Sequence, residues 1–199
     1  MKNSVMEQIK NRIDALPARS AFVASDFADI ADYQNAKKCL LRLEEGKFVR
    51  RVLRGVYDKP CFSGLPNEFS SPDLGEISGA IARNYSWKIA PTGATSLNLL
   101  GLSAQAVGSC EYYSSGQYKD YEVGETAIRF LRRSSKELLC LSHESALVVS
   151  PIKELGVGID DEAVAKIRHR LSERSRAVLL EESAHVTKWI YEVIKRICR

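Results

Sequence analysis

The first sixty residues place short helical and extended patterns in a fixed order, which restricts the folds open to this part of the chain. Apolar residues recur at the spacing of one helix face over residues 5–16, directly before Pro17. Residues 21–23 (AFV) indicate a brief strand. Ser25 then has the side chain of an N-cap for a second helix over residues 26–31.

A third helix is predicted over residues 34–45, with its apolar side chains on one face and Gly46 ending it as the C′ residue. Residues 48–53 alternate as a strand, and after a tight turn residues 56–59 return as a second strand. Helix, short strand, helix, turn, helix and hairpin is the element order of a winged helix-turn-helix. The sequence therefore predicts that fold for residues 1–60.

The charge distribution agrees with a nucleic-acid role for this part. Residues 1–60 carry 12 basic and 8 acidic side chains, whereas residues 61–199 carry 17 of each, so the whole excess of +4 lies in the first third. Within residues 33–60, eight basic side chains face only three acidic ones. A patch of this kind releases counterions on meeting DNA and makes binding strongly salt-dependent.

The residue types on the third helix and hairpin suit two different contacts. Long polar donors on a recognition helix can reach base edges in the major groove, and arginines on a wing can meet phosphates. A protein–protein adaptor with a merely solvated basic face remains the alternative. The base or groove candidates are Gln34, Asn35, Lys38 and Arg42, the phosphate candidates are Arg50, Arg51 and Arg54, and Lys37 and Lys59 complete the predicted DNA-binding set.

The remainder of the chain is predicted as a separate α+β domain. Residues 61–75 are rich in Gly, Pro and Ser and form the linker candidate, and residues 76–199 form the second domain. A small, mostly antiparallel sheet and a long C-terminal helix over residues 174–197 are expected there. The other expected elements are helices over 76–84, 95–100, 142–150 and 161–171 and strands over 87–90, 109–114, 118–123 and 126–132.

Several features of the second domain have two interpretations. Arg129, Arg132, Arg133 and Lys136 form a basic strip that contacts a partner, extends the DNA-binding surface or is a solvent face balanced by neighbouring acids. The same alternatives hold for the basic helix at 166–176. Four tyrosines around a Ser/Gly turn suit a contact surface or a half-buried sheet. The PTGATS loop suits an anion cradle or ordinary N-capping.

No motif points to catalysis, a metal or a cofactor, so none of these is expected. His143-Glu144 lacks the second histidine of HExxH, and no GxSxG elbow is present. A nucleic-acid-processing enzyme with its site in the second domain is the least favoured alternative. The five scattered cysteines, the lack of a secretory signal pattern and the lack of a long apolar run lead us to expect a cytoplasmic protein that does not bind a membrane.

The run FVASDFADIADYQNAKKCLLRLEEGKFVRRVLRGVYDKP resembles the N-terminal winged helix of AbiEi-like antitoxins, the regulators of type IV abortive-infection toxin–antitoxin systems. IAPTGATSLNLLGLS and WIYEVIKRI resemble later segments of a short subgroup of that family. The resemblance implies an autorepressor that binds double-stranded DNA at its own promoter. It also implies an antitoxin that counters a nucleotidyltransferase-type toxin without a stable complex. The oligomeric state stays open.

Overall fold

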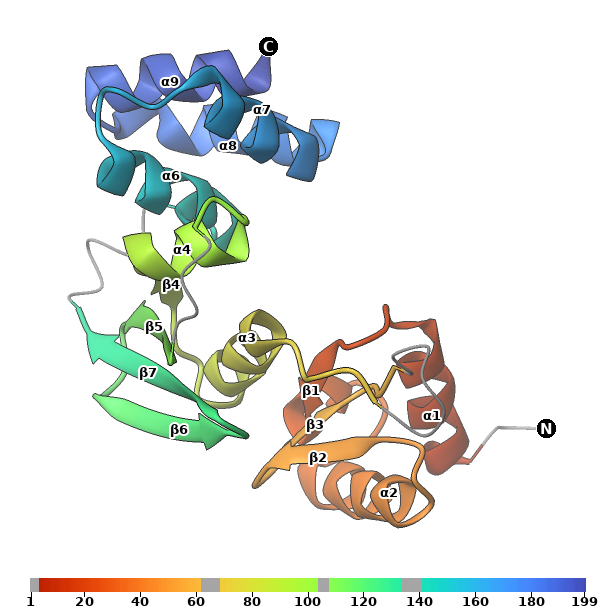
Figure 1. Ribbon diagram of the computed structural model, residues 1–199. Helices are drawn as coiled ribbons and strands as arrows, with labels where there is room; N and C mark the ends of the chain where they lie inside the picture. The colour runs from red at the N-terminus through yellow and green to blue at the C-terminus, as the bar shows by residue number, and fades with distance from the viewer. Residues whose placement is uncertain (1–3, 62–68, 104–107, 134–140) are drawn as a thin grey trace. The chain divides into compact units, whose positions relative to one another are not determined.

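The computed structural model describes residues 4–61, 69–103, 108–133 and 141–199 and divides the chain into two compact units, Met1–Trp87 and Lys88–Arg199. Both units combine helices with a small sheet, so the chain is α+β (Figure 1). Among the described residues, no helix is both long enough and apolar enough to cross a membrane.

The first unit contains a three-stranded antiparallel sheet with strand order β1-β3-β2. Its core joins the inner faces of the first two helices to the sheet, and Ile9, Ile13, Leu40 and Phe22 are almost completely buried there. The elements are α1 (Val5–Ala15), β1 (Ala21–Val23), the 3-10 turn η1 (Ala24–Phe27), α2 (Tyr33–Glu45), β2 (Arg50–Leu53), β3 (Val56–Asp58) and α3 (Leu74–Asn84).

The predicted second helix over residues 26–31 is wrong, because only the four-residue turn η1 forms there. Ser25 is not its N-cap. The Asp26 carboxylate instead accepts a hydrogen bond from the backbone N–H of Val23 at 3.1 Å. It also forms an ion pair with Arg83 of α3 at 2.9 Å. These contacts hold the Asp26 side chain against β1 and α3, and the helical conformation ends within one turn.

The helix α3 belongs to the first unit, whereas the sequence placed the second domain from residue 76. Ile77 and Ile81 are buried on α3, and Arg83 donates to the carbonyl oxygen of Ala21 in β1 at 2.9 Å. These long-range contacts cannot be seen in the local pattern, which explains why the predicted boundary lies earlier in the chain. Asp73 is the N-cap of α3, and its Oδ1 accepts the backbone N–H groups of Gly75 and Glu76.

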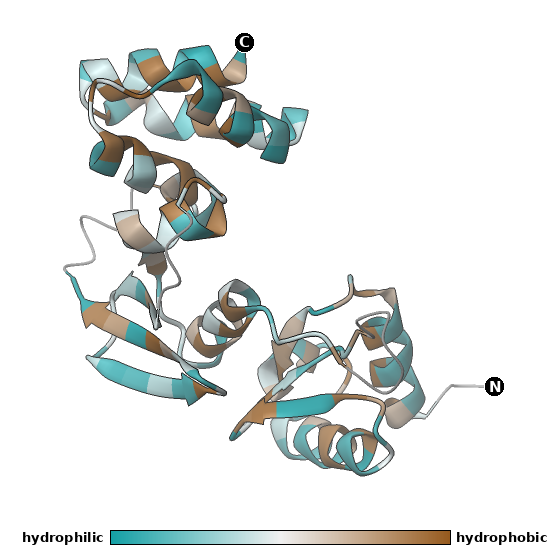
Figure 2. Ribbon diagram, viewed as in Figure 1, coloured by the Kyte–Doolittle hydropathy of each residue, from teal (hydrophilic) through white to brown (hydrophobic). Residues whose placement is uncertain are grey.

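The second unit begins with a four-stranded sheet of order β4-β5-β7-β6. Its strands are β4 (Ile89–Pro91), β5 (Ser109–Ser114), β6 (Lys119–Val123) and β7 (Thr126–Arg132). Two pairings are antiparallel, but β5 and β7 run parallel, so the sheet is mixed. The edge strand β6 is almost entirely hydrophilic (Figure 2).

The helices of the second unit pack around one core in which Val148, Ile152, Ile167 and Ile194 are fully buried or nearly so. Within this unit α6 contacts α4 as well as α8 and α9 (Figure 1). The helical elements are α4 (Gly93–Leu99), α6 (His143–Leu155), α7 (Asp161–Arg170), α8 (Glu173–Glu182), the 3-10 turn η2 (Ser183–His185) and α9 (Lys188–Cys198).

The helical character of residues 174–197 is confirmed, but these residues do not form one helix. They divide into α8, η2 and α9. The carboxylate of Glu182 accepts the backbone N–H of Ser142 at the start of α6 at 2.8 Å, and the break follows directly. The apolar stripe therefore continues across two helices rather than along one.

Candidate nucleic-acid interface

The helix α2 begins at a strong N-cap. Asp32 accepts the backbone N–H groups of Gln34 and Asn35 at 3.0 Å each through Oδ1, and the side chain of Asn35 at 2.6 Å through Oδ2. The bond from the Asn35 backbone lowers the pKa of Asp32 and outweighs the effect of burial. The carboxylate therefore stays ionised and satisfies the first N–H groups of α2.

The polar residues predicted on α2 lie on its outer face. Ala36, Leu40 and Leu43 are buried against α1 and the sheet, which leaves the opposite face to solvent. The five candidates on this helix are all exposed, and they are Gln34, Asn35, Lys37, Lys38 and Arg42.

The hairpin separates its arginines into two classes. Arg51 and Arg54 are exposed, at the outer side of β2 and in the turn. Arg50 instead forms a two-bond ion pair with Asp58 of β3, at 3.0 Å from Nε and 2.5 Å from a terminal nitrogen. Asp58 is completely buried, and Arg50 also donates to the carbonyl oxygen of Ser70 at 3.1 Å. The structure thus gives Arg50 an internal role instead of the predicted phosphate contact.

Lys59 also has internal partners. Its ammonium group donates to the carbonyl oxygens of Asp14 and Leu16 at 2.7 and 2.8 Å, which caps the C-terminal end of α1. A cation in this position satisfies orphan carbonyl groups and interacts favourably with the helix dipole. Lys59 is therefore removed from the candidate interface, as is Arg50.

The end of α2 contributes a cation that the candidate set omitted. Lys47 is exposed and left-handed, with φ of 56°, and its N–H donates to Glu44 at 2.8 Å while that of Phe48 donates to Leu43 at 2.9 Å. These are the two bonds of a Schellman motif, so Lys47 and not Gly46 is the C′ residue. Sequence patterns place glycine at the C′ position, so they could not predict that Lys47 would take this left-handed conformation.

Aromatic residues near the interface divide in the same way. Tyr33, at the first position of α2, is half exposed, and sequence analysis did not single it out. Tyr57 of β3 is buried opposite Phe22, and burial raises the pKa of its hydroxyl. Tyr57 therefore packs within the sheet.

Most of the basic side chains that have assigned contacts in these two regions of the second unit interact with other residues of the same unit. Arg129 lies between Glu111 and Asp120 on neighbouring strands, with nitrogen–oxygen distances of 3.6 and 3.8 Å. Arg133 lies 4.7 Å from the ring centre of Tyr113. Arg132 is exposed, and Lys136 lies outside the described residues. The interpretation as a balanced solvent face therefore applies to Arg129.

The basic helix region at 166–176 supplies caps to other helices. Arg168 donates to the carbonyl oxygens of Ile197 and Arg196 at the end of α9, and Arg170 donates to Leu99 at the end of α4 at 2.8 Å. Positive charge at a helix C-terminus is favourable. These arginines hold α7, α9 and α4 together.

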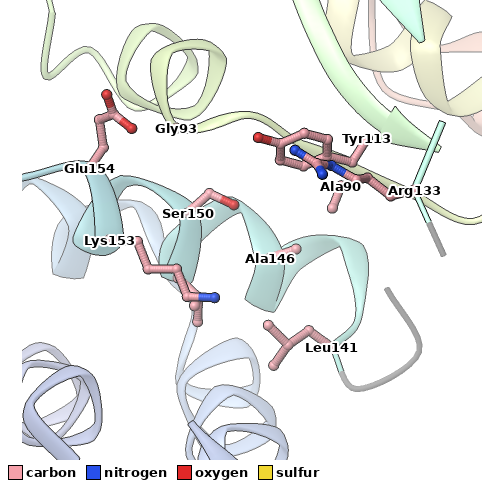
Figure 3. A pocket seen from close by; sticks show the side chains of 10 residues that line it. Ala90, Gly93, Tyr113, Arg133, Leu141, Ala146, Ser150, Lys153 and Glu154 are labelled. Carbon is pink, nitrogen blue, oxygen red and sulfur yellow. The ribbon is translucent and has the colours of Figure 1, made fainter. Parts of the chain in front are cut away.

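A cavity of about 490 Å³ in the second unit lies between α6 and the segment that joins β4 to α4 (Figure 3). Ser150 and Lys153 project from α6, and the ring of Tyr113 lies against Arg133 at one end (Figure 3). Within the described residues, no group of three or more histidine, cysteine or acidic side chains is arranged to hold a metal ion.

The carboxylate of Glu154 lies against the PTGATS loop, where an external anion would otherwise bind. Thr92 caps α4 by accepting the N–H of Thr95 at 3.4 Å. A Cβ placed on Gly93 would lie 2.6 Å from Oε2 of Glu154, so this side chain lies directly against the start of α4. N-capping is therefore the role of this loop, and Glu154 supplies the negative charge that a helix N-terminus favours.

The fold and these sites define a two-unit α+β protein with a basic helix and hairpin in its first unit. The model of DUF6088, a family of unknown function, matches residues 8–179, so the chain belongs to this family. No curated protein matches the chain.

Proposed function

We propose that this protein is a DNA-binding transcriptional regulator whose first unit acts as a winged helix-turn-helix. In this proposal α2 enters the major groove and the β2–β3 hairpin lies against the backbone or in the minor groove. The order α1, β1, η1, α2, β2 and β3 supports it.

The observation that carries the proposal is the set of exposed cations on α2, its C-terminal turn and the hairpin. They are Lys37, Lys38, Arg42, Lys47, Arg51 and Arg54. Arg50 and Lys59 have internal partners, so the proposed interface keeps seven members of the predicted set and gains Lys47. Exposed cations in this number would give strong, salt-dependent binding to phosphates.

The resemblance to AbiEi-like antitoxins supports a more specific version of the proposal. In it the protein represses its own operon and opposes a nucleotidyltransferase-type toxin, without forming a stable complex with it. The second unit, residues Lys88–Arg199, would carry the antitoxin activity. The protein would act in the cytoplasm.

The test is binding of the full chain to a duplex that contains its own promoter, measured by fluorescence anisotropy at several salt concentrations. We expect a steep fall in affinity with salt, and an equal weakening of all sequences in Arg51→Ala plus Arg54→Ala. Each lost phosphate contact should reduce the salt slope by about one. If no duplex binds at low salt, the DNA-binding proposal is wrong and a protein–protein adaptor is favoured instead.

A further inference from the structure

The first turn of α2 holds one amide side chain in a fixed orientation at an exposed position. Asn35 donates from Nδ2 to Asp32 at 2.6 Å, and the same carboxylate accepts the backbone N–H groups of Gln34 and Asn35. An ionised carboxylate only accepts hydrogen bonds, so the amide group must face it with nitrogen and not with oxygen. The orientation of the Asn35 amide is therefore determined chemically.

This orientation leaves one donor and one acceptor of the Asn35 amide available for an external partner. One N–H of the Asn35 amide is used by Asp32, while its second N–H and its carbonyl oxygen remain for an external partner. In the major groove, adenine presents an acceptor at N7 beside a donor at N6, which is the complement of that pair. Guanine presents two acceptors there, cytosine a donor, and thymine an acceptor with a methyl group.

The position of Asn35 on α2 suits contact with a base edge. N-terminal residues of a recognition helix are those that reach base edges in helix-turn-helix proteins. The Asp32 charge already satisfies the positive end of α2, so this end is not a phosphate site. The exposed cations lie further along: Lys37 and Lys38 on the second turn of α2, Lys47 just after its end, and Arg51 and Arg54 on the hairpin.

We propose that Asn35 reads an adenine in the major groove and that Asp32 is the positioning residue that holds it for this contact. The inference rests on the function proposed above. It adds that specificity depends on an A·T pair recognised at the start of α2. Fixing the side chain before binding lowers the entropy cost of the contact.

The test selects preferred sites for the full-length protein from a randomised duplex library, followed by competition binding of single-base variants. Wild type should prefer adenine at one position by roughly tenfold or more, and Asn35→Ala should lose this preference while keeping the others. Glu45→Ala is the control, since Glu45 is an exposed residue of α2 outside the candidate set and its replacement keeps the Asp32–Asn35 bond. This variant should retain the adenine preference.

The variant Asp32→Ser tests the positioning role. Serine can still cap α2, but it lacks the charged acceptor that holds the Asn35 amide. We expect higher affinity for all sequences, because a negative charge near DNA is removed, together with a several-fold smaller ratio of adenine over other bases at the Asn35 position. A structural role alone would not change that ratio at a single position.

The outcomes separate this inference from the proposed function. If wild type binds no duplex, the proposed function fails. If wild type selects a motif that Asn35→Ala leaves unchanged, or if the lost preference is for a base other than adenine, only the assignment of Asn35 is overturned. Thermal unfolding of each variant excludes loss of the fold as the cause.

Discussion

Arg50 and Asp58 form a two-bond ion pair across β2 and β3, and the carboxylate of Asp58 is completely buried. The next residue, Arg51, points to solvent because side chains alternate along a strand. Two adjacent arginines of the same hairpin therefore have different tasks.

We expect Arg50→Ala to destabilise the first unit by about 3 kcal/mol, because the substitution leaves a buried charge without its partner. Arg51→Ala is the matched control and should leave the free energy of unfolding within about 0.5 kcal/mol of wild type. Chemical denaturation measures both, and DNA binding should show the reverse sensitivity at a temperature where both variants are folded. Equal stability of the two variants would contradict the assigned roles.

Lys47 should show opposite effects on stability and binding. Relief of its left-handed conformation in Lys47→Gly should raise the free energy of unfolding by about 1 kcal/mol. The same variant should bind DNA more weakly and with a smaller salt slope. Lys47→Ala loses the charge and keeps the unfavourable conformation, so it should weaken binding without the gain in stability. If both variants bind as wild type does, Lys47 is not part of the interface.

Glu182 should make the second unit sensitive to acid. Burial raises the pKa of this carboxyl, but hydrogen bonds from Ser145 and Ser142 outweigh that effect and lower it overall. A carboxyl group whose pKa is lowered by folding stabilises the protein at pH values above its pKa in the unfolded chain. This stabilisation is lost as the pH falls through the pKa of the group in the folded protein. Glu182→Gln should therefore lower the Tm at neutral pH, and its difference from wild type should shrink below about pH 4. A difference that is constant with pH would exclude this cause.

Arg168 should act in folding and not in DNA binding. Its guanidinium group donates to two carbonyl oxygens at the end of α9, so Arg168→Ala should cost about 1 kcal/mol or more. The exposed Arg174 is the matched control on the neighbouring helix. Affinity for DNA should be unchanged in Arg168→Ala, and a clear loss of affinity at full folding would return this helix to the interface.

Gly93 should not tolerate a side chain. An added Cβ would lie 2.6 Å from Oε2 and 2.9 Å from Cβ of Glu154, and the second contact cannot be relieved by rotating the carboxylate. Gly93→Ala should destabilise the second unit by about 1–3 kcal/mol, as overpacking does in other proteins. Thermal unfolding is the measurement, and an unchanged Tm would show that α4 and α6 can separate without cost.

Local patterns were enough to predict most helices and strands. The third helix was expected over residues 34–45 and forms as Tyr33–Glu45, and the strands over 109–114 and 126–132 have the expected bounds. In each case the apolar spacing and the flanking residues act within a few positions of one another. The exposed face of α2 follows from the same spacing.

Partners distant in the sequence account for what the patterns did not predict. Nothing near Lys59 indicates that its ammonium group reaches the carbonyl oxygens of Asp14 and Leu16. The parallel pairing of β5 with β7 likewise depends on which edge of β5 remains after β4 has paired. Charge counts treat every arginine alike, so they could not separate Arg50 from Arg51.

The ion pair between Arg50 and Asp58 also has a consequence for how this family diverges. A buried carboxylate and its guanidinium partner are costly to change one at a time, so relatives that replace the residue at position 50 should replace the one at position 58 as well. No such linkage constrains position 51, which is free to follow changes in whatever the hairpin contacts. Among relatives, positions 50 and 58 should therefore change together, whereas position 51 should vary independently of both.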